Sequence, residues 1–182
     1  MCLASIPFFK EIIIMAFSCD YCGYRNTDIK HGGGMSKHGT KIVFHVNTPT
    51  DLNRDVFKSD SCIMELPAID FSMAPGSLDS MYTTVEGLLD KLHTALTESN
   101  PFGTGDSAIN QKYQDFLSGL IELKEFKRGP FILVLDDALS NCFIYNPHAP
   151  EADPQVEVTV YERTWEQNEE LGINDMKVDD EQ

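Results

Sequence analysis

Residues 40–47, TKIVFHVN, decide the fold class of this 182-residue chain. Ile42, Phe44 and Val46 occupy every second position, an alternation typical of a strand with one side against the core. Further strands are predicted on both sides of this stretch, at 6–17, 27–30, 62–66, 68–73, 131–137, 142–145 and 156–162. Pro67 separates two of them, because proline interrupts the pairing of strands. The sequence therefore predicts a mainly β (α+β) protein.

Two helices are predicted to interrupt these strands at about 82–128. Thr83 and Glu86 have the spacing of a capping box, in which each side chain satisfies a free backbone donor of the other. Each helix shows one apolar face, made of Val85, Leu88, Leu89, Leu92 and Leu96 in the first and of Tyr113, Phe116, Leu117, Leu120 and Ile121 in the second. Gly129 should stop the second helix, and a last short helix is expected within 164–172, opened by a second capping box. The two long helices form an inserted helical hairpin.

The chain has a formal net charge of −15, and the negative charge is concentrated toward its end. From residue 151 to residue 182 there are eleven acidic side chains against two basic ones, Arg163 and Lys177. Such a surface repels nucleic-acid phosphates and anionic membranes, and it steers basic proteins toward it. We interpret the acidic block either as a solubilising tail or as a docking surface.

Five cysteines, an odd number, argue against a disulfide framework and favour a reducing, intracellular compartment. Cys19 and Cys22 form the one Cys-x-x-Cys pair, and glycine follows at once. A zinc knuckle, a redox pair and two unrelated buried thiols are all compatible with this spacing, but glycine disfavours the helix that a redox pair needs. Cys2 is a possible third zinc ligand. The other two cysteines lie in apolar strands and are predicted core residues, Cys62 and Cys142.

No catalytic constellation can be recognised in the sequence. None of the five histidines is followed two positions later by Asp or Glu, a spacing typical of the facial triad that binds iron. Asp136-Asp137 ends a strand but lacks the further oxygen ligands of a calcium loop. We therefore predict no enzymatic activity. The alternative hypothesis, from a different functional class, is a metal-dependent β-barrel enzyme.

Motifs spread along nearly the whole chain form an ordered series. They read IPFFKEIIIMAFSCDYCGYRNTDIK, GTKIVFHV, LNRDVFKSD, TTVEGLL, NPHAP and RTWEQNEELGINDMK. This series resembles the ZPR-type zinc-finger proteins of eukaryotes and archaea. The resemblance implies a zinc ribbon followed by a β-helix-like (double-stranded β-helix) domain with an inserted helical hairpin. Eukaryotic members carry two such modules, and NEELGINDMK with NPFGTGDS makes this chain most like the second, although NPHAP is more typical of the first.

The resemblance also divides the chain and assigns its zinc ligands. It implies three segments: a partial zinc finger at 1–34, a β-domain at 35–172 and an acidic flexible tail at 173–182. Of the four zinc ligands of the family, only the second pair carries over, onto Cys19 and Cys22, and the first Cys-x-x-Cys is missing from this chain. The strands predicted at 131–137 and 142–145 flank a turn at 138–141 as a hairpin, and in this turn Ser140 stands where family members usually have glycine.

The resemblance implies a non-enzymatic protein that binds translation elongation factor 1-alpha and helps this GTPase fold. It also implies zinc as the cofactor and the cytoplasm and nucleus as the location. An acidic surface suits this basic partner through electrostatic steering. Arg54, Asp55 and Lys58 match the family motif NRDVFKSD, and they either face a partner or form ion pairs at a strand edge. A truncated module without independent function is a further possibility.

Overall fold

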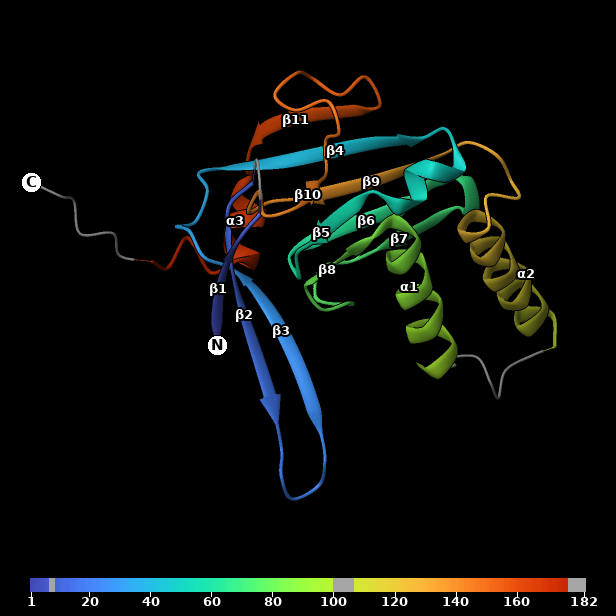
Figure 1. Cartoon of the computed structure of the whole chain (residues 1–182), viewed down its shortest axis with the longest axis horizontal. Helices are drawn as coiled ribbons and strands as arrows, with labels where there is room; N and C mark the ends of the chain where they lie inside the picture. Colours follow the sequence, from blue (N-terminus) through green and yellow to red (C-terminus); the bar gives the residue numbers. More distant parts are fainter. Residues whose placement is uncertain (7–8, 100–106, 177–182) are drawn as a thin grey trace, which may run out of the picture.

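The computed structural model describes residues 1–6, 9–99 and 107–176 (Figure 1). In chain order its elements are β1 (Cys2–Ser5), β2 (Glu11–Ser18), β3 (Arg25–His31), β4 (His38–Val46), η1 (Pro49–Asn53), β5 (Asp55–Lys58), β6 (Cys62–Leu66), η2 (Pro67–Ile69), β7 (Phe71–Met73), β8 (Met81–Thr84), α1 (Val85–Ser99), α2 (Ser107–Lys124), β9 (Phe131–Asp137), β10 (Phe143–Ile144), β11 (Val156–Glu162) and α3 (Trp165–Glu170). No helix in this described part is long and apolar enough to cross a membrane. The last six residues of the predicted acidic tail, 177–182, lie outside the described residues.

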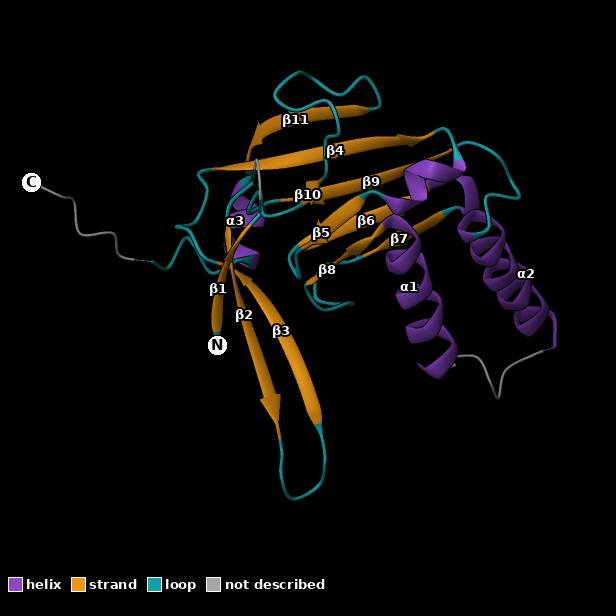
Figure 2. Ribbon diagram, in the orientation of Figure 1, coloured by secondary structure: helices purple, strands orange, loops and turns teal. Residues whose placement is uncertain are grey.

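Two antiparallel sheets form a β-sandwich (Figure 2). The larger sheet has the strand order β11-β4-β9-β6-β7, and the smaller has the order β10-β5-β8. Side chains at alternate positions of both sheets meet in one core, among them Phe44, Met64, Leu133 and Leu135 from the larger sheet and Val56 from the smaller. This arrangement confirms the predicted mainly β fold, a double-stranded β-helix with an inserted helical hairpin.

The helical hairpin is inserted between β8 and β9 and lies at one end of the sandwich (Figure 2). Its first helix buries the predicted apolar residues Val85, Leu88, Leu89 and Leu92. The capping box predicted for Thr83 and Glu86 is wrong by one residue, because α1 begins at Val85. Gly87 therefore takes the third helical position, and its N–H donates to the Thr84 hydroxyl at 3.1 Å. Ile121, predicted on the apolar face of the second helix, is exposed.

The β1-β2-β3 sheet packs its base against the sandwich, while the β2–β3 hairpin extends away from it (Figure 1). The strand predicted at 6–17 is confirmed for 11–17, which lie in β2, but its first part is wrong, because the chain reverses there and Phe9 N donates to Ile6 O at 3.1 Å. This reversal allows Phe9 to stack on Phe143 of the sandwich, with ring centroids 4.7 Å apart. It also creates a second small core, made of Ile6, Ile12 and Phe57.

The turn at 138–141 crosses from one sheet to the other. We expected β9 and β10 to flank a hairpin, but β9 pairs with β4 and β6, whereas β10 pairs with β5 in the smaller sheet. Ser140 has φ +56°, a conformation that glycine adopts without strain, which is consistent with the glycine that the resemblance implies at this position. The Ser140 hydroxyl donates to His38 O at 2.6 Å and thereby helps to hold the strained backbone in place.

Gly39 occupies a point of β4 where the fold leaves no room for a side chain. Tyr161 lies opposite it in the β4–β11 pairing, and a Cβ at Gly39 would overlap the Tyr161 ring. Gly39→Ala should therefore lower the free energy of unfolding by about 1–3 kcal/mol, measured by urea titration. Gly34→Ala is the matched control, because no atom lies within 4 Å of the added Cβ and a change below about 0.5 kcal/mol is expected. Equal losses in the two variants would contradict this account of Gly39.

Candidate metal centre and partner surface

Cys19 and Cys22 lie in the turn between β2 and β3. Gly23, with φ +72°, donates its N–H to Cys19 O at 2.9 Å and closes the turn. Backbone hydrogen bonds from Cys22 and Tyr21, with a further one from the Cys22 side chain, lower the pKa of the Cys19 thiol. A lowered pKa favours the thiolate, which is the form that binds zinc. The pair lies in a turn and not at the start of a helix, so its geometry favours the zinc knuckle over the redox pair.

Cys2, the suggested third ligand, is not brought to this knuckle. It lies opposite Ile14 in the β1–β2 pairing, and Cys19 follows Ile14 by five residues, about 16 Å along a strand. A structural zinc site takes four ligands. Within the described residues there is no group of three or more His, Cys, Asp or Glu side chains that can hold a metal ion. These residues therefore fit half of a zinc site, and two further ligands have to come from outside them.

Cys62 and Cys142 are both buried, which confirms the prediction that they are core residues. A hydrogen bond between the two thiols and the burial of Cys62 raise the pKa of the Cys62 thiol far above its usual value. Because a neutral thiol is a poor nucleophile and a poor metal ligand, Cys62 acts as a small apolar residue in the core.

Arg54 holds two segments of the chain together inside the sandwich. Its guanidinium forms ion pairs with Asp51, at 3.3 Å, and with Asp153, and it donates a further hydrogen bond to Gln155. The same group lies 4.8 Å from the centre of the Phe44 ring, within reach of a cation–π contact. Of the two interpretations left open by the sequence, the structure shows ion pairing for Arg54, and it shows this pairing in the interior and not at an exposed edge.

Lys58 is fully buried, and Asp55 is partly buried. The Lys58 ammonium donates to Ser59 O and Leu78 O, both at 2.8 Å, and burial lowers its pKa. Asp55 accepts a hydrogen bond from the Tyr82 hydroxyl at 3.0 Å. Contact between a partner and the side chains of Arg54 or Lys58 would thus require this part of the domain to open, and among the three residues only Asp55 is partly accessible.

Asp137, the last residue of β9, accepts four hydrogen bonds in the interior. The donors are the hydroxyls of Ser59, at 2.8 Å, and Ser61, at 2.7 Å, and the backbone N–H groups of Leu139, at 2.9 Å, and Asn141, at 2.7 Å. Ser59 and Ser61 lie between β5 and β6, while Leu139 and Asn141 lie between β9 and β10. One carboxylate therefore holds two of the connections between the two sheets, β5–β6 and β9–β10, and the protein's own donors occupy its oxygens.

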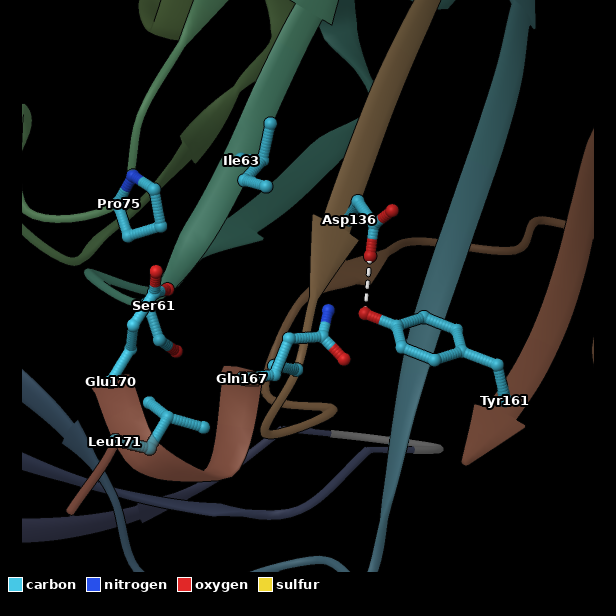
Figure 3. A pocket seen from close by; sticks show the side chains of 9 residues that line it. Ser61, Ile63, Pro75, Asp136, Tyr161, Gln167, Glu170 and Leu171 are labelled. Atoms are coloured by element: carbon cyan, nitrogen blue, oxygen red, sulfur yellow. Dashed lines mark hydrogen bonds between the residues drawn. The ribbon is translucent and has the colours of Figure 1, made fainter. Parts of the chain in front are cut away.

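A small cavity of about 130 Å³ lies between α3 and the outer face of the larger sheet (Figure 3). Within it, the Tyr161 hydroxyl donates to Asp136 at 2.6 Å, and burial together with this hydrogen bond raises the pKa of Tyr161. Ligand sites are usually larger than about 300 Å³. Asp136 and its neighbours therefore form a packing contact of α3, and the Asp136-Asp137 pair shows no arrangement for a bound cation.

Two protein-family models match this chain. The ZPR1 zinc-finger domain matches residues 1–37, and the ZPR1 jelly-roll domain matches residues 50–173. This chain belongs to the ZPR1 family. The zinc-finger match covers the β1-β2-β3 sheet with the Cys19–Cys22 pair, and the jelly-roll match covers most of the sandwich and the inserted helical hairpin. The resemblance read from the sequence is thereby confirmed.

Relatives with curated descriptions agree with this assignment. The chain is 42% identical to "Zinc finger protein ZPR1" of Bos taurus over 98% of its own length and 39% of that protein. It is 39% identical, with the same coverage of both chains, to "Zinc finger chaperone zpr1" of Schizosaccharomyces pombe. An uncharacterised ZPR1-like protein of Methanocaldococcus jannaschii is 23% identical over 72% of this chain and 65% of its own length. The chain thus spans about two fifths of the length of the eukaryotic ZPR1 relatives it matches.

The two thiolates of the Cys19–Cys22 knuckle predict how much zinc this member of the ZPR1 family binds. We expect the 182-residue chain to bind zinc weakly, with less than one zinc per chain in elemental analysis, because two thiolates do not close a structural site. Cys19→Ser should remove this zinc, whereas Cys2→Ser, a change opposite Ile14, should leave it unchanged. One tightly held zinc per chain that survives Cys19→Ser would contradict the assignment of the knuckle.

Proposed function

We propose that this chain is a non-enzymatic protein-binding module that engages translation elongation factor 1-alpha, as a folding chaperone or as a regulator of this GTPase. One observation carries the proposal: over nearly its whole length the chain is 39% identical to a fission-yeast relative whose name is that of a chaperone. The family's zinc finger, here with the Cys19–Cys22 pair, supplies a metal-dependent part of the module. We further propose that the protein acts in the cytoplasm and the nucleus.

Charge supports a basic partner. The net charge of −15 favours association with basic proteins through long-range attraction, which raises the association rate more than the affinity. Exposed carboxylates on β11 and α3, including Glu162 and Glu170, belong to the acidic block noted in the sequence. The docking interpretation of this block therefore predicts a salt-sensitive complex, whereas a solubilising tail does not.

The test is association of the purified chain with purified elongation factor 1-alpha, with and without added zinc. We expect co-elution in gel filtration and a higher yield of active elongation factor when it refolds from denaturant in the presence of the chain. Failure of both with zinc supplied would contradict the proposal.

A matched pair of variants separates docking from solubility. Glu162→Gln combined with Glu170→Gln should slow association several-fold at low salt, while Glu86→Gln combined with Glu98→Gln on α1 removes the same charge and should have little effect. Equal effects of both pairs would support a general role of net charge over a docking surface on β11 and α3.

A further inference from the structure

The outer edge of the larger sheet, at β11, presents unpaired backbone groups. Among the described residues β11 pairs with β4 on one side only. His45 N donates to Gln155 O at 2.9 Å, which makes these two a hydrogen-bonded pair of the β4–β11 ladder. Since such pairs alternate along an antiparallel ladder, residues 157, 159 and 161 also bond to β4, and residues 158, 160 and 162 direct their N–H and C=O groups outward. The N–H of Val156 is already used, because it donates to Asp153 O at 3.2 Å.

An apolar groove lies beside this edge. The side chains of Val156, Val158 and Val160 share the inner face of the sheet with Phe44, Ile42 and Thr40, their partners on β4. Yet Val158 is 59% exposed and Val160 is 62% exposed, because the smaller sheet ends before it covers them. The groove has a volume of about 480 Å³ and is lined mainly by Ile42, Val156 and Val158 on one side and by Cys142, Phe143 and Ile144 on the other. The sandwich is therefore open between β11 and β10.

The sequence of β11 contains neither Lys nor Pro, so its only charged side chains are acidic. Natural edge strands usually carry Lys, Pro or a bulge that prevents pairing, whereas β11 reads VEVTVYE and pairs in unbroken register. Its charges are negative, since Glu162 is exposed and the Glu157 side chain on the outer face is 71% exposed. A second copy of this chain would bring the same charge of −15 to the contact, so the charge favours a basic segment over self-association.

We propose that β11 binds an extended peptide segment as an added strand, with apolar side chains at every second position in the groove and Lys or Arg at the positions between them. The backbone groups of Val158 and Val160 bond to the added strand, and its apolar side chains cover the exposed valines. Its basic side chains lie on the outer face, beside Glu157. The proposal goes beyond the proposed function, because it assigns a binding mode and a segment chemistry to one edge of the sandwich, whichever basic protein supplies the segment.

The test uses a short blocked peptide of alternating valine and lysine, followed by amide hydrogen exchange in NMR. In the free protein, the amides of residues 157, 159 and 161 should exchange slowly and those of 158 and 160 rapidly. Addition of the peptide should slow exchange at 158 and 160 by at least about tenfold. Binding without protection of these two amides would overturn strand addition.

Fluorescence anisotropy with the labelled peptide measures the contribution of each feature. Val158→Pro should weaken binding at least about tenfold while the thermal unfolding midpoint stays close to that of the wild type, because the lost N–H points away from β4. If Val158→Pro fails to fold, Val158→Thr combined with Val160→Thr removes the apolar contact instead, with Ile121→Thr on α2 as the control for an exposed apolar residue. Retained affinity in Val158→Pro or in the double variant would overturn the proposal.

Two further measurements decide the chemistry of the occupant. A peptide with glutamate in place of lysine should bind at least about tenfold more weakly, and equal affinity would refute the basic segment. Sedimentation of the protein alone should give a monomer. If the protein is a dimer and Val158→Pro makes it a monomer, a second copy occupies the edge. That result would overturn the proposal of a basic segment.

Discussion

Replacing Arg54 with alanine should lower the free energy of unfolding by about 3–5 kcal/mol, because the change leaves two interior carboxylates without their cation. The Asp153 side chain is 2% exposed and that of Asp51 is 9% exposed, so water cannot replace the guanidinium. The variant also loses the contact with the Phe44 ring and the hydrogen bond to Gln155. Urea titration followed by circular dichroism measures this loss.

Two control variants separate the ion pairs from the side chain that makes them. Arg54→Lys keeps the positive charge but loses the planar guanidinium, whose several N–H groups contact Asp51, Asp153 and Gln155 together. We therefore expect a loss of unfolding free energy that is smaller than in Arg54→Ala. Arg128→Ala breaks an ion pair with Glu122 whose partners are 42% and 45% exposed, and it should cost about 1 kcal/mol or less. If Arg54→Ala costs no more than Arg128→Ala, the interior pairing does not stabilise the fold.

The same site predicts how the stability of the variant depends on pH. Burial raises the pKa of Asp51, but hydrogen bonds from Gln155, Thr48 and Asn47 outweigh it, and the pKa of Asp51 lies below its usual 3.8. A lowered carboxyl pKa contributes stability at pH values above the unfolded pKa, and this stability is lost as the pH falls through the folded pKa. In Arg54→Ala the Asp51 carboxylate loses a neighbouring cation, which raises its pKa relative to that in the wild type, so the loss of stability should be larger at pH 7 than at about pH 4.

Periodicity made most of the fold predictable from the sequence. The alternating valines of 156–162 predicted β11 with its bounds, and the helical spacing of Leu88, Leu89 and Leu92 predicted the face that α1 buries. Both patterns succeed because each element places its apolar side chains on a single face, although on β11 Val158 and Val160 of that face are exposed. The capping box at Thr164 likewise predicted the start of α3, since the hydrogen bonds of a cap are local.

The wrong predictions depend on contacts between distant residues. The stretch 6–17 contains Pro7 and the charged pair Lys10-Glu11, which the prediction of a single strand did not use as signals of a break. The reversal buries Ile6 and Ile12 against Phe57 of the sandwich. The segments that became β9 and β10 are neighbours in sequence, yet β4 takes one of them and β5 the other. No local sequence pattern encodes which strand pairs with which. The prediction of a hairpin from two strands adjacent in sequence was therefore wrong.

The sequence predicted those parts of the candidate site whose residues are close together in the chain. The spacing of Cys19 and Cys22 identified the knuckle, but Cys2 was proposed from its residue type alone, and the strand register places it elsewhere. Arg54, Asp55 and Lys58 were proposed from their match to the family motif NRDVFKSD, either as residues that face a partner or as ion pairs at a strand edge. The interior partners of Arg54 and Lys58 were missed because Asp153, for example, is 99 residues away from Arg54.

Asp137→Ala should destabilise the fold about as much as Arg54→Ala, with an expected loss of about 3–5 kcal/mol in the free energy of unfolding. The change removes the acceptor of four donors while the position stays closed to water, since Asp137 is 0% exposed. The two serine hydroxyls can rotate toward other acceptors, but the backbone N–H groups of Leu139 and Asn141 cannot, and both would be left unpaired in a partly buried turn. A thermal scan and a urea titration measure the loss.

Two further substitutions test whether the loss of the four hydrogen bonds causes the destabilisation in Asp137→Ala. Asp136→Ala, one residue earlier in β9, loses a single hydrogen bond from Tyr161, so about 1 kcal/mol is expected. Asp137→Asn should fall between the two alanine variants, because its amide keeps one acceptor oxygen but turns an N–H group toward remaining donors. Equal losses for Asp136→Ala and Asp137→Ala would show that the fold does not depend on the carboxylate at the crossovers. A large loss specific to Asp137 would mean that one buried acceptor holds the β5–β6 and β9–β10 connections between the sheets, and with them the position of β10 along the groove.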